Sequence, residues 1–258
     1  MIILPAIDII DGVPVRLVQG DYSRKTKVAS SIKDTAVTFA HQGASWLHMV
    51  DLDGAKAQHP VNSGAILDAA IAAGIHTEVG GGIRTMSDIR LYLEGGISRV
   101  ILGTAALENE ELLKEALARY GSRIAVGIDA RNGIVALNGW LQSSDQTYQS
   151  VAEKMAELGV QTIIATDISR DGTMRGINTA MYSELCQLKH VNVIASGGVG
   201  SMDDLQALTH TGVAGVICGK ALYEGRINLF EAIARYERVV SKTRKATDRY
   251  LTAEKPEI

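Results

Sequence analysis

The chain has 258 residues, of which 46% are apolar and 21% are charged, and this balance is typical of a globular protein with a sizeable core. Its net charge of −3 and its pI near 6.1 argue against a nucleic-acid-binding protein that relies on bulk positive charge, so any anion binding has to be local. Cys186 and Cys218 are the only cysteines and form no C-x-x-C pair, which indicates neither a disulfide framework nor a cysteine metal site.

The first residues, Met1 to Asp8, contain no basic segment, and their apolar run is far too short for a signal peptide or a membrane span. We therefore expect a cytoplasmic protein with no membrane partner.

Short apolar, β-branched runs alternate with segments of helical periodicity, and we count eight such units. The expected strands are Ile2–Asp8, Trp46–Asp51, Thr77–Val79, Arg99–Leu102, Ile124–Asp129, Thr162–Thr166, Val191–Ala195 and Gly215–Ile217. The expected helices are Ile32–Gln42, Asn62–Ala73, Met86–Glu94, Glu110–Arg119, Thr147–Leu158, Thr179–Leu188, Met202–Thr211 and Asn228–Ser241. Eight alternating units predict an α/β protein with one (β/α)8 TIM barrel over residues 1–241.

The two halves of this barrel share a register of 116 positions, which predicts an internal two-fold repeat of half-barrels, about 1–120 and 121–241. The matching pairs are Gly43 and Gly159, Asp51 and Asp167, Gly81 and Gly197, Gly96 and Gly212, Gly103 and Gly219, and Ala105 and Ala221. Residues 242–258 are polar and are expected to form a frayed tail, with an interaction segment as the alternative.

Two glycine-rich stretches, Glu78-Val-Gly-Gly-Gly-Ile-Arg84 and Ile194-Ala-Ser-Gly-Gly-Val-Gly200, each follow an expected strand and precede an expected helix. Glycine lets backbone N–H groups approach an anion at a helix N-terminus, so each stretch is a candidate phosphate site. The alternatives are a tight turn without ligand and, for the first stretch, an unused relic of duplication.

Active sites of such barrels lie at the carboxyl ends of the strands. The ends of strands one, two, five and six carry Asp8, Asp51, Asp129 and Asp167, and Asp51 is a candidate substrate-binding residue. The ends of the other four carry the candidate phosphate-binding residues Gly81, Gly82, Gly103, Thr104, Ser196, Gly197, Gly198, Gly219 and Lys220. Because these two groups alternate around the barrel, we expect an elongated small-molecule ligand with a phosphate at each end.

Opposed carboxylates can hold different pKa values, so that one accepts a proton while the other donates. Asp8 and Asp129 fit an aldose-to-ketose rearrangement, which needs acid assistance to ring opening and removal of a proton from the neighbouring carbon. Asp171, in the loop after the sixth strand, is a second candidate for the acid, and the sequence does not choose between it and Asp129.

Three further side chains have open alternatives. Arg84 is expected either to clamp a phosphate or to form a surface salt bridge. His48 either contacts the ligand or is a buried core histidine, and Trp140 either stacks on a heterocycle or plugs the barrel rim. The histidine spacing predicts no metal site, and no dinucleotide fingerprint or P-loop is present, so no cofactor is expected.

From Ile2 to about Tyr236 the chain resembles the phosphoribosylformimino-5-aminoimidazole carboxamide ribotide isomerases of histidine biosynthesis. The resemblance is carried by the segments Pro5–Leu17, Val50–Lys56, Val79–Arg84, Thr166–Thr173 and Ser196–Val199.

The resemblance implies an Amadori rearrangement of a bisphosphorylated substrate without metal or organic cofactor. It implies that Asp8 is the general base and Asp129 the usual proton donor, with Asp171 as the alternative acid and Thr166 nearby. It also implies substrate binding by Arg16, Arg84 and Trp140. A monomer is the expected state, and activity on the related phosphoribosyl anthranilate is left open.

Two other functions remain as alternatives. One is the sister barrel that makes imidazole glycerol phosphate with a glutaminase partner, although its first strand is expected to carry a cysteine, which is absent here. The other is a non-catalytic barrel that senses a bisphosphate, and the paired acids Asp8 and Asp129 disfavour it.

Overall fold

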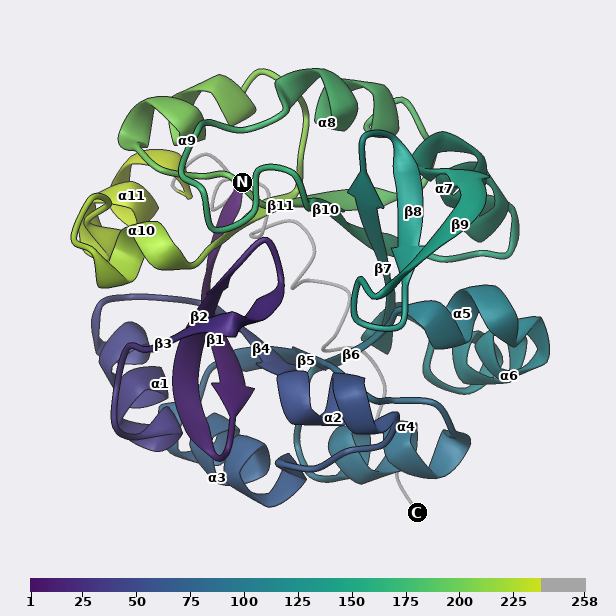
Figure 1. Cartoon of the computed structure of the whole chain (residues 1–258), viewed down its shortest axis with the longest axis horizontal. Helices are drawn as coiled ribbons and strands as arrows, with labels where there is room; N and C mark the ends of the chain where they lie inside the picture. The colour runs from purple at the N-terminus through teal and green to yellow at the C-terminus, as the bar shows by residue number, and fades with distance from the viewer. Residues whose placement is uncertain (238–258) are drawn as a thin grey trace, which may run out of the picture.

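Residues 1–237 are described by the computed structural model, and a closed barrel of parallel strands lies at their centre (Figure 1). Pairing of β12 with β1 and of β7 with β10 closes the ring, so the predicted (β/α)8 barrel is confirmed. Within this range the barrel strands are β1 (Ile2–Ile10), β4 (Trp46–Asp51), β5 (His76–Gly80), β6 (Arg99–Leu102), β7 (Ile124–Arg131), β10 (Thr162–Asp167), β11 (Asn192–Ser196) and β12 (Gly215–Cys218).

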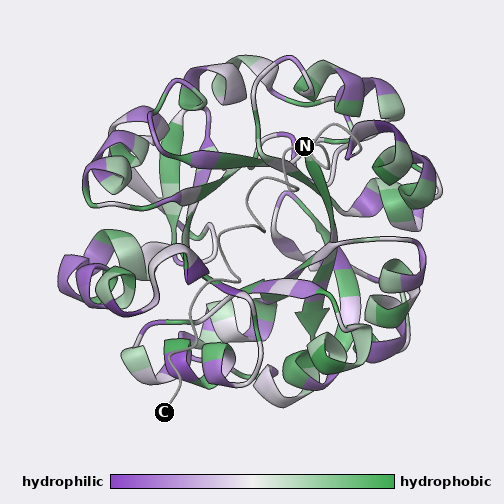
Figure 2. Cartoon of the chain, turned by 180° about the vertical axis from the view of Figure 1, so that it is seen from behind, coloured by the Kyte–Doolittle hydropathy of each residue, from purple (hydrophilic) through white to green (hydrophobic). Residues whose placement is uncertain are grey.

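Helices surround the barrel and turn their apolar faces toward the strands, as the hydropathy colouring of Figure 2 shows. The longer ones are α1 (Ile32–His41), α3 (Ser63–Ala73), α4 (Met86–Glu94), α6 (Glu110–Tyr120), α7 (Tyr148–Glu157), α8 (Thr179–Leu185), α9 (Met202–Leu208) and α11 (Leu229–Tyr236). Each matches an expected helix to within a few residues. None of the helices within residues 1–237 has the length and apolar character needed to cross a bilayer.

The predicted ends of two helices are wrong. The helix α8 ends at Leu185 rather than at Leu188, and α9 ends at Leu208 rather than at Thr211. Beyond α9, the hydroxyl of Thr211 donates to the Leu208 carbonyl, and such local side-chain bonds compete with helix continuation. The end of the last expected helix, residues 238–241, and the expected tail, 242–258, lie outside the described residues.

Several short elements were not predicted, and all but the 3-10 turn lie at the carboxyl ends of the strands. They are the helices α2 (Leu52–Ala57), α5 (Thr104–Glu108) and α10 (Lys220–Tyr223), the 3-10 turn 121–123, and the hairpin strands β2 (Val13–Val18), β3 (Asp21–Lys27), β8 (Ile134–Leu137) and β9 (Gln142–Thr147). The stretch Asn138–Ser144 forms the turn between β8 and β9 and the beginning of β9. Because β3 and β9 are almost wholly polar and exposed, they lack the apolar alternation by which strands are recognised.

The core has two layers. One large cluster fills the space between strands and helices, and a smaller one fills the inside of the barrel. The inner cluster consists of Leu4, Ala6, Ile101, Ala125, Ile164, Ile194 and Ile217, each 8% exposed or less. The barrel is therefore packed below its mouth, and a ligand has access only to the end where the hairpins lie.

Candidate active site

A cavity of about 250 Å3 opens at the carboxyl ends of the barrel strands. Sequence-predicted site residues from both halves of the chain line this cavity. They are Asp8, Arg16, His48, Gly81, Gly82, Arg84, Gly103, Thr104, Asp129, Trp140, Thr166, Asp171, Ser196, Gly197, Gly198, Gly219 and Lys220.

Asp51 is the exception, and its prediction as a substrate-binding residue is wrong. Its side chain is fully buried and accepts hydrogen bonds from the backbone N–H groups of Gly54, Val61 and Asn62. Both carboxylate oxygens are engaged in holding the loop after β4 at the start of α2, so neither faces a ligand.

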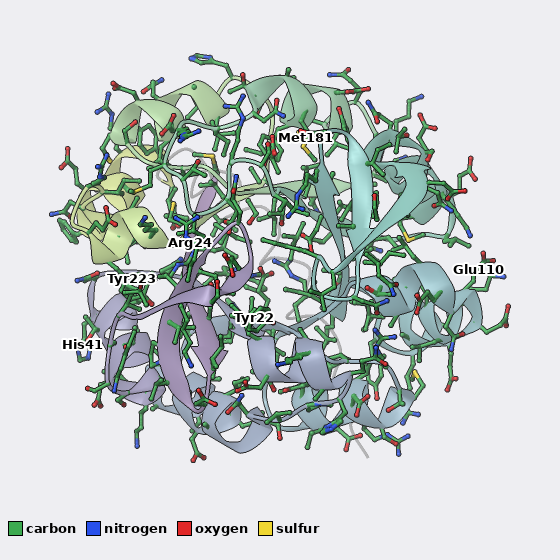
Figure 3. The ribbon with its side chains drawn as sticks, in the orientation of Figure 1. Tyr22, Arg24, His41, Glu110, Met181 and Tyr223 are labelled. Carbon is green, nitrogen blue, oxygen red and sulfur yellow. The ribbon has the colours of Figure 1, made fainter. Side chains whose placement is uncertain are left out.

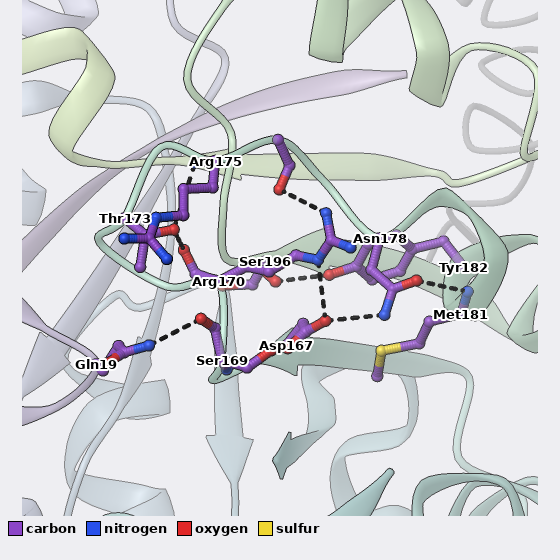
Figure 4. Close-up of polar contacts among 11 residues, drawn as sticks. Gln19, Asp167, Ser169, Arg170, Thr173, Arg175, Asn178, Met181, Tyr182 and Ser196 are labelled. Atoms are coloured by element: carbon purple, nitrogen blue, oxygen red, sulfur yellow. Dashed lines mark hydrogen bonds and ion pairs between the residues drawn. The ribbon is translucent and has the colours of Figure 1, made fainter. Parts of the chain in front are cut away.

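Asp167, at the matching position of β10, likewise organises its own loop. It accepts hydrogen bonds from Ser169 and Asn178 and lies 3.5 Å from the Arg170 guanidinium (Figure 4). Arg170 in turn donates to the carbonyl of Gly176. This network fixes the loop after β10, which carries Asp171 into the cavity.

Asp8 lies at the end of β1, and its carboxylate forms an ion pair with Arg16 of β2, with 2.9 Å between Oδ2 and Nη1. Both side chains are largely buried, since that of Arg16 is 10% and that of Asp8 is 18% exposed. The arrangement supplies an anionic acceptor beside a fixed cation.

Asp129, near the end of β7, accepts a hydrogen bond of 2.8 Å from the indole Nε1 of Trp140. Burial raises the pKa of Asp129, while hydrogen bonds from Thr166 and Trp140 act in the opposite direction. Its Oδ2 atom is therefore engaged by a side chain from the turn between β8 and β9.

Asp171 is a second buried carboxyl of the cavity with a raised pKa. Burial raises its pKa to about 6, the Arg16 guanidinium opposes that change, and the charges of Asp8 and Asp129 add to it. The three carboxyls are thus electrostatically coupled, and a pKa of about 6 allows Asp171 to carry a proton near neutral pH.

The glycine turns have left-handed backbones, with φ of +104° at Gly81 and +92° at Gly197. A Cβ atom would lie 2.1 Å from the Asp51 carbonyl oxygen at Gly81 and 2.7 Å from that of Asp167 at Gly197. Glycine is required here because the neighbouring loop backbone passes so close.

An aspartate side chain already binds part of the N-terminus of each helix that follows these turns. In α4, Asp88 accepts from the backbone N–H groups of Arg84 and Thr85, and in α9, Asp204 accepts from those of Gly200 and Ser201. By contrast, α5 and α10 start directly after Gly103 and Gly219 with no side-chain cap. The starts of α5 and α10 therefore carry backbone N–H groups that no side chain caps.

Basic side chains accompany both turns. Arg84 donates to the Asn138 side chain at 2.6 Å and lies 3.4 Å from Glu108. On the opposite side, Lys220 donates to the carbonyl of Gly172, and the Arg16 guanidinium lies so close to Gly219 that a Cβ there would clash with it.

Four residues of the site were missed in the sequence. Asn138 holds Arg84, the turn at Gly20 packs against the Trp140 ring, Tyr22 of β3 donates to the Leu52 carbonyl, and Glu78 binds His48. Tyr22 lies near the centre of the barrel opening, whereas Glu110 and His41 lie on the periphery (Figure 3). For Glu78 a signal was available, because it is a charged residue in the middle of an expected barrel strand.

Metal ligation is not indicated: within residues 1–237 no three His, Cys, Asp or Glu side chains gather in a cluster able to hold an ion.

Comparisons with known proteins agree with this arrangement. Residues 2–228 match the family described as histidine biosynthesis protein. The chain is 49% identical over 233 residues to a protein of Clostridium botulinum and equally to one of Listeria monocytogenes, covering 90% of this chain and 98% and 97% of theirs. A protein of Geobacillus kaustophilus is 48% identical over 234 residues, covering 90% of this chain and 96% of its own. All three are named 1-(5-phosphoribosyl)-5-((5-phosphoribosylamino)methylideneamino) imidazole-4-carboxamide isomerase.

Proposed function

The chain belongs to the histidine biosynthesis protein family, and we propose that it is the isomerase of this pathway, with its chemistry at the barrel mouth. The reaction is an Amadori rearrangement of the bisphosphorylated ribotide that its relatives are named for. The observation that carries this proposal is one cavity lined by Asp8, Asp129 and Asp171 with glycine turns on both sides.

The reaction needs an acid and a base in sequence. A proton must reach the ring oxygen of the aminoaldose as its bond to carbon 1 breaks, and a base must then take the proton from carbon 2. The resulting enolamine tautomerises to the aminoketose. No oxidant or reductant enters, because carbon 1 is reduced as carbon 2 is oxidised.

Asp8 is the proposed base. It is a carboxylate with a fixed counter-ion, Arg16, and it lies in the cavity away from bulk water. A base held within reach of the proton it removes contributes roughly 10² to 10⁴ to the rate.

Asp171 is the proposed acid. Its pKa of about 6 leaves a usable protonated fraction near neutral pH, whereas Asp129 is engaged by Trp140. Asp129 then orients the indole and the Thr166 hydroxyl rather than transferring the proton. This assignment is our proposal for the choice between Asp129 and Asp171 that the sequence left open.

The substrate phosphates would occupy the two glycine turns. One turn offers Gly81, Gly82 and Gly103 with Arg84, and the other offers Gly197, Gly198 and Gly219 with Lys220. Backbone N–H groups and a cation at each end would hold the ribotide across the carboxylates.

An assay of the full-length protein with the ribotide tests the proposal. The aminoketose should form without ammonia and without added metal or organic cofactor. In a second assay with the aminoketose as substrate, formation of imidazole glycerol phosphate on addition of ammonia would identify the sister cyclase instead. Tight binding of the ribotide with turnover in neither assay would identify a sensor. The monomeric state stays a prediction to be tested beside it. The sequence left turnover of phosphoribosyl anthranilate open, and the same assay with that substrate measures it.

A further inference from the structure

A buried ionic chain runs through the barrel beside the cavity. The Glu78 side chain is 0% exposed, and its Oε1 atom lies 2.7 Å from His48 Nδ1. Its Oε2 atom accepts two hydrogen bonds from Arg99, at 2.9 Å from Nε and 2.5 Å from Nη2. The Arg99 guanidinium also stacks on the Trp46 ring, 4.4 Å from its centroid.

These contacts determine which ring nitrogen of His48 carries the hydrogen of the bond to Glu78. Burial raises the pKa of Glu78, but the hydrogen bond from His48 and the charge and hydrogen bonds of the Arg99 guanidinium outweigh it, so the pKa lies below its ordinary value. An ionised carboxylate can only accept, so the hydrogen of the His48–Glu78 bond belongs to Nδ1. The other ring nitrogen, Nε2, is then left for the cavity that His48 lines.

The barrel does not need this chain for its packing. In the 116-residue register, His48, Glu78 and Arg99 correspond to Ile164, Ile194 and Gly215, and the two isoleucines belong to the inner apolar cluster. Apolar residues therefore fill the matching positions of the same barrel. Burying charged groups costs desolvation free energy that apolar residues do not incur, so a role beyond packing is indicated.

We propose that Glu78, held by Arg99, is a positioning residue that fixes His48 in the Nδ1–H form and aims Nε2 at the cavity as an acceptor for an N–H group of the bound ribotide. The ligand's identity rests on the proposed function; the form of the ring does not. Glu78 itself does not touch the substrate.

The form of the ring is measured first, in the unmodified protein. Nitrogen-15 NMR of the histidine-labelled full-length chain, with His48→Asn to assign the signal, should show hydrogen on Nδ1 and none on Nε2 at neutral pH. The Nε2–H form in the wild-type protein would overturn the proposal, whether or not the protein turns over the ribotide.

Replacement of Glu78 then separates positioning from packing. Glu78→Leu removes the acceptor, so the Nε2–H form should appear, and kcat/KM should fall about 10- to 100-fold. Glu78→Gln keeps an acceptor for Nδ1–H and should stay within about threefold of the wild type. Ile194→Val, a core change at the matching position, controls for lost stability and should leave kcat/KM and the His48 signal unchanged.

A double-mutant cycle gives the sharpest result. If Glu78 acts through His48, Glu78→Leu should add no further loss of kcat/KM to that of His48→Asn. If the double variant instead loses the product of the two single losses of kcat/KM, the proposal is overturned. It is also overturned if the His48 ring stays in the Nδ1–H form in Glu78→Leu. If Glu78→Leu does not fold, Glu78→Gln carries the test, and the Nε2–H form in that variant contradicts the proposed hydrogen bond. A protein inactive on the ribotide would contradict the proposed function alone.

Discussion

Asp8 is the residue on which the proposed chemistry depends most. Asp8→Asn keeps the size and the fold, because only one ion pair, with Arg16, is lost, but it removes the acceptor for the carbon 2 proton. We expect kcat to fall by roughly 10² to 10⁴ with an unchanged circular dichroism spectrum. Asp11→Asn is the matched control, since Asp11 is an exposed carboxylate outside the cavity, paired with Lys25, and its replacement should leave kcat within twofold. Equal turnover of Asp8→Asn and the wild type would exclude Asp8 as the base.

The raised pKa of Asp171 predicts how the stability of the protein depends on pH. Its pKa is raised from 3.8 in the unfolded chain to about 6, so the folded state binds the proton more tightly. That contribution to stability is fully present below pH 4 and is lost as the pH rises through 6. Asp171→Asn should therefore be more stable than the wild type at pH 7.5, by about 1 to 2 kcal/mol, with the difference disappearing on the acid side. Denaturant unfolding at pH 7.5 and below pH 4 measures the difference in the free energy of unfolding between the variant and the wild type. A variant less stable than the wild type at pH 7.5 would contradict the raised pKa of Asp171.

The same variant distinguishes the two candidate acids. With Asp171 as acid, kcat/KM should decline on the alkaline side with an apparent pKa at or above about 6, and Asp171→Asn should lose that limb along with most of its activity. If Asp129→Asn shows this behaviour instead, Asp129 is the acid.

At the scale of elements, the glycine turns are held by loop backbones rather than by helix ends. Gly197→Ala would place a Cβ atom 2.7 Å from the Asp167 carbonyl in a left-handed backbone. Gly43→Ala has the same strain, with φ of +94°, but nothing within 4 Å of the new atom. We expect Gly197→Ala to be the less stable of the two by about 1 to 3 kcal/mol, measured by denaturant unfolding. Equal loss would mean that strain alone, without the close approach, requires glycine.

The sequence predicted the barrel elements well because each buries an apolar face and so has a clear period. It did not predict the hairpins, in which β3 and β9 are polar and are stabilised by pairing with β2 and β8. It also misjudged Asp51, because a carboxylate at a strand end gives the same sequence signal whether it faces a ligand or caps its own loop. Contacts between distant loops, such as Gly20 against Trp140, leave no local signal at all.

At the scale of the whole molecule, the two halves of the barrel share glycine turns and helix caps at matching positions. Gly81 and Gly197, and likewise the capping boxes of α4 and α9, lie 116 residues apart with similar backbone geometry. The half-barrel repeat nevertheless stays a prediction, because this likeness does not establish a duplication. The two halves differ where one has His48 and Glu78 and the other has isoleucines at the matching positions. Such a difference would allow a substrate with a phosphate at each end to bind in one direction only.

The central claim is that one bisphosphate spans the two glycine turns over the carboxylates. A crystal structure of Asp8→Asn with the unconverted ribotide tests it most directly. We predict one phosphate at Gly81, Gly82 and Gly103, the other at Gly197, Gly198 and Gly219, and the reacting ribose between position 8 and Asp171. A ribotide anchored at a single turn, with its other phosphate in solvent, would contradict the account.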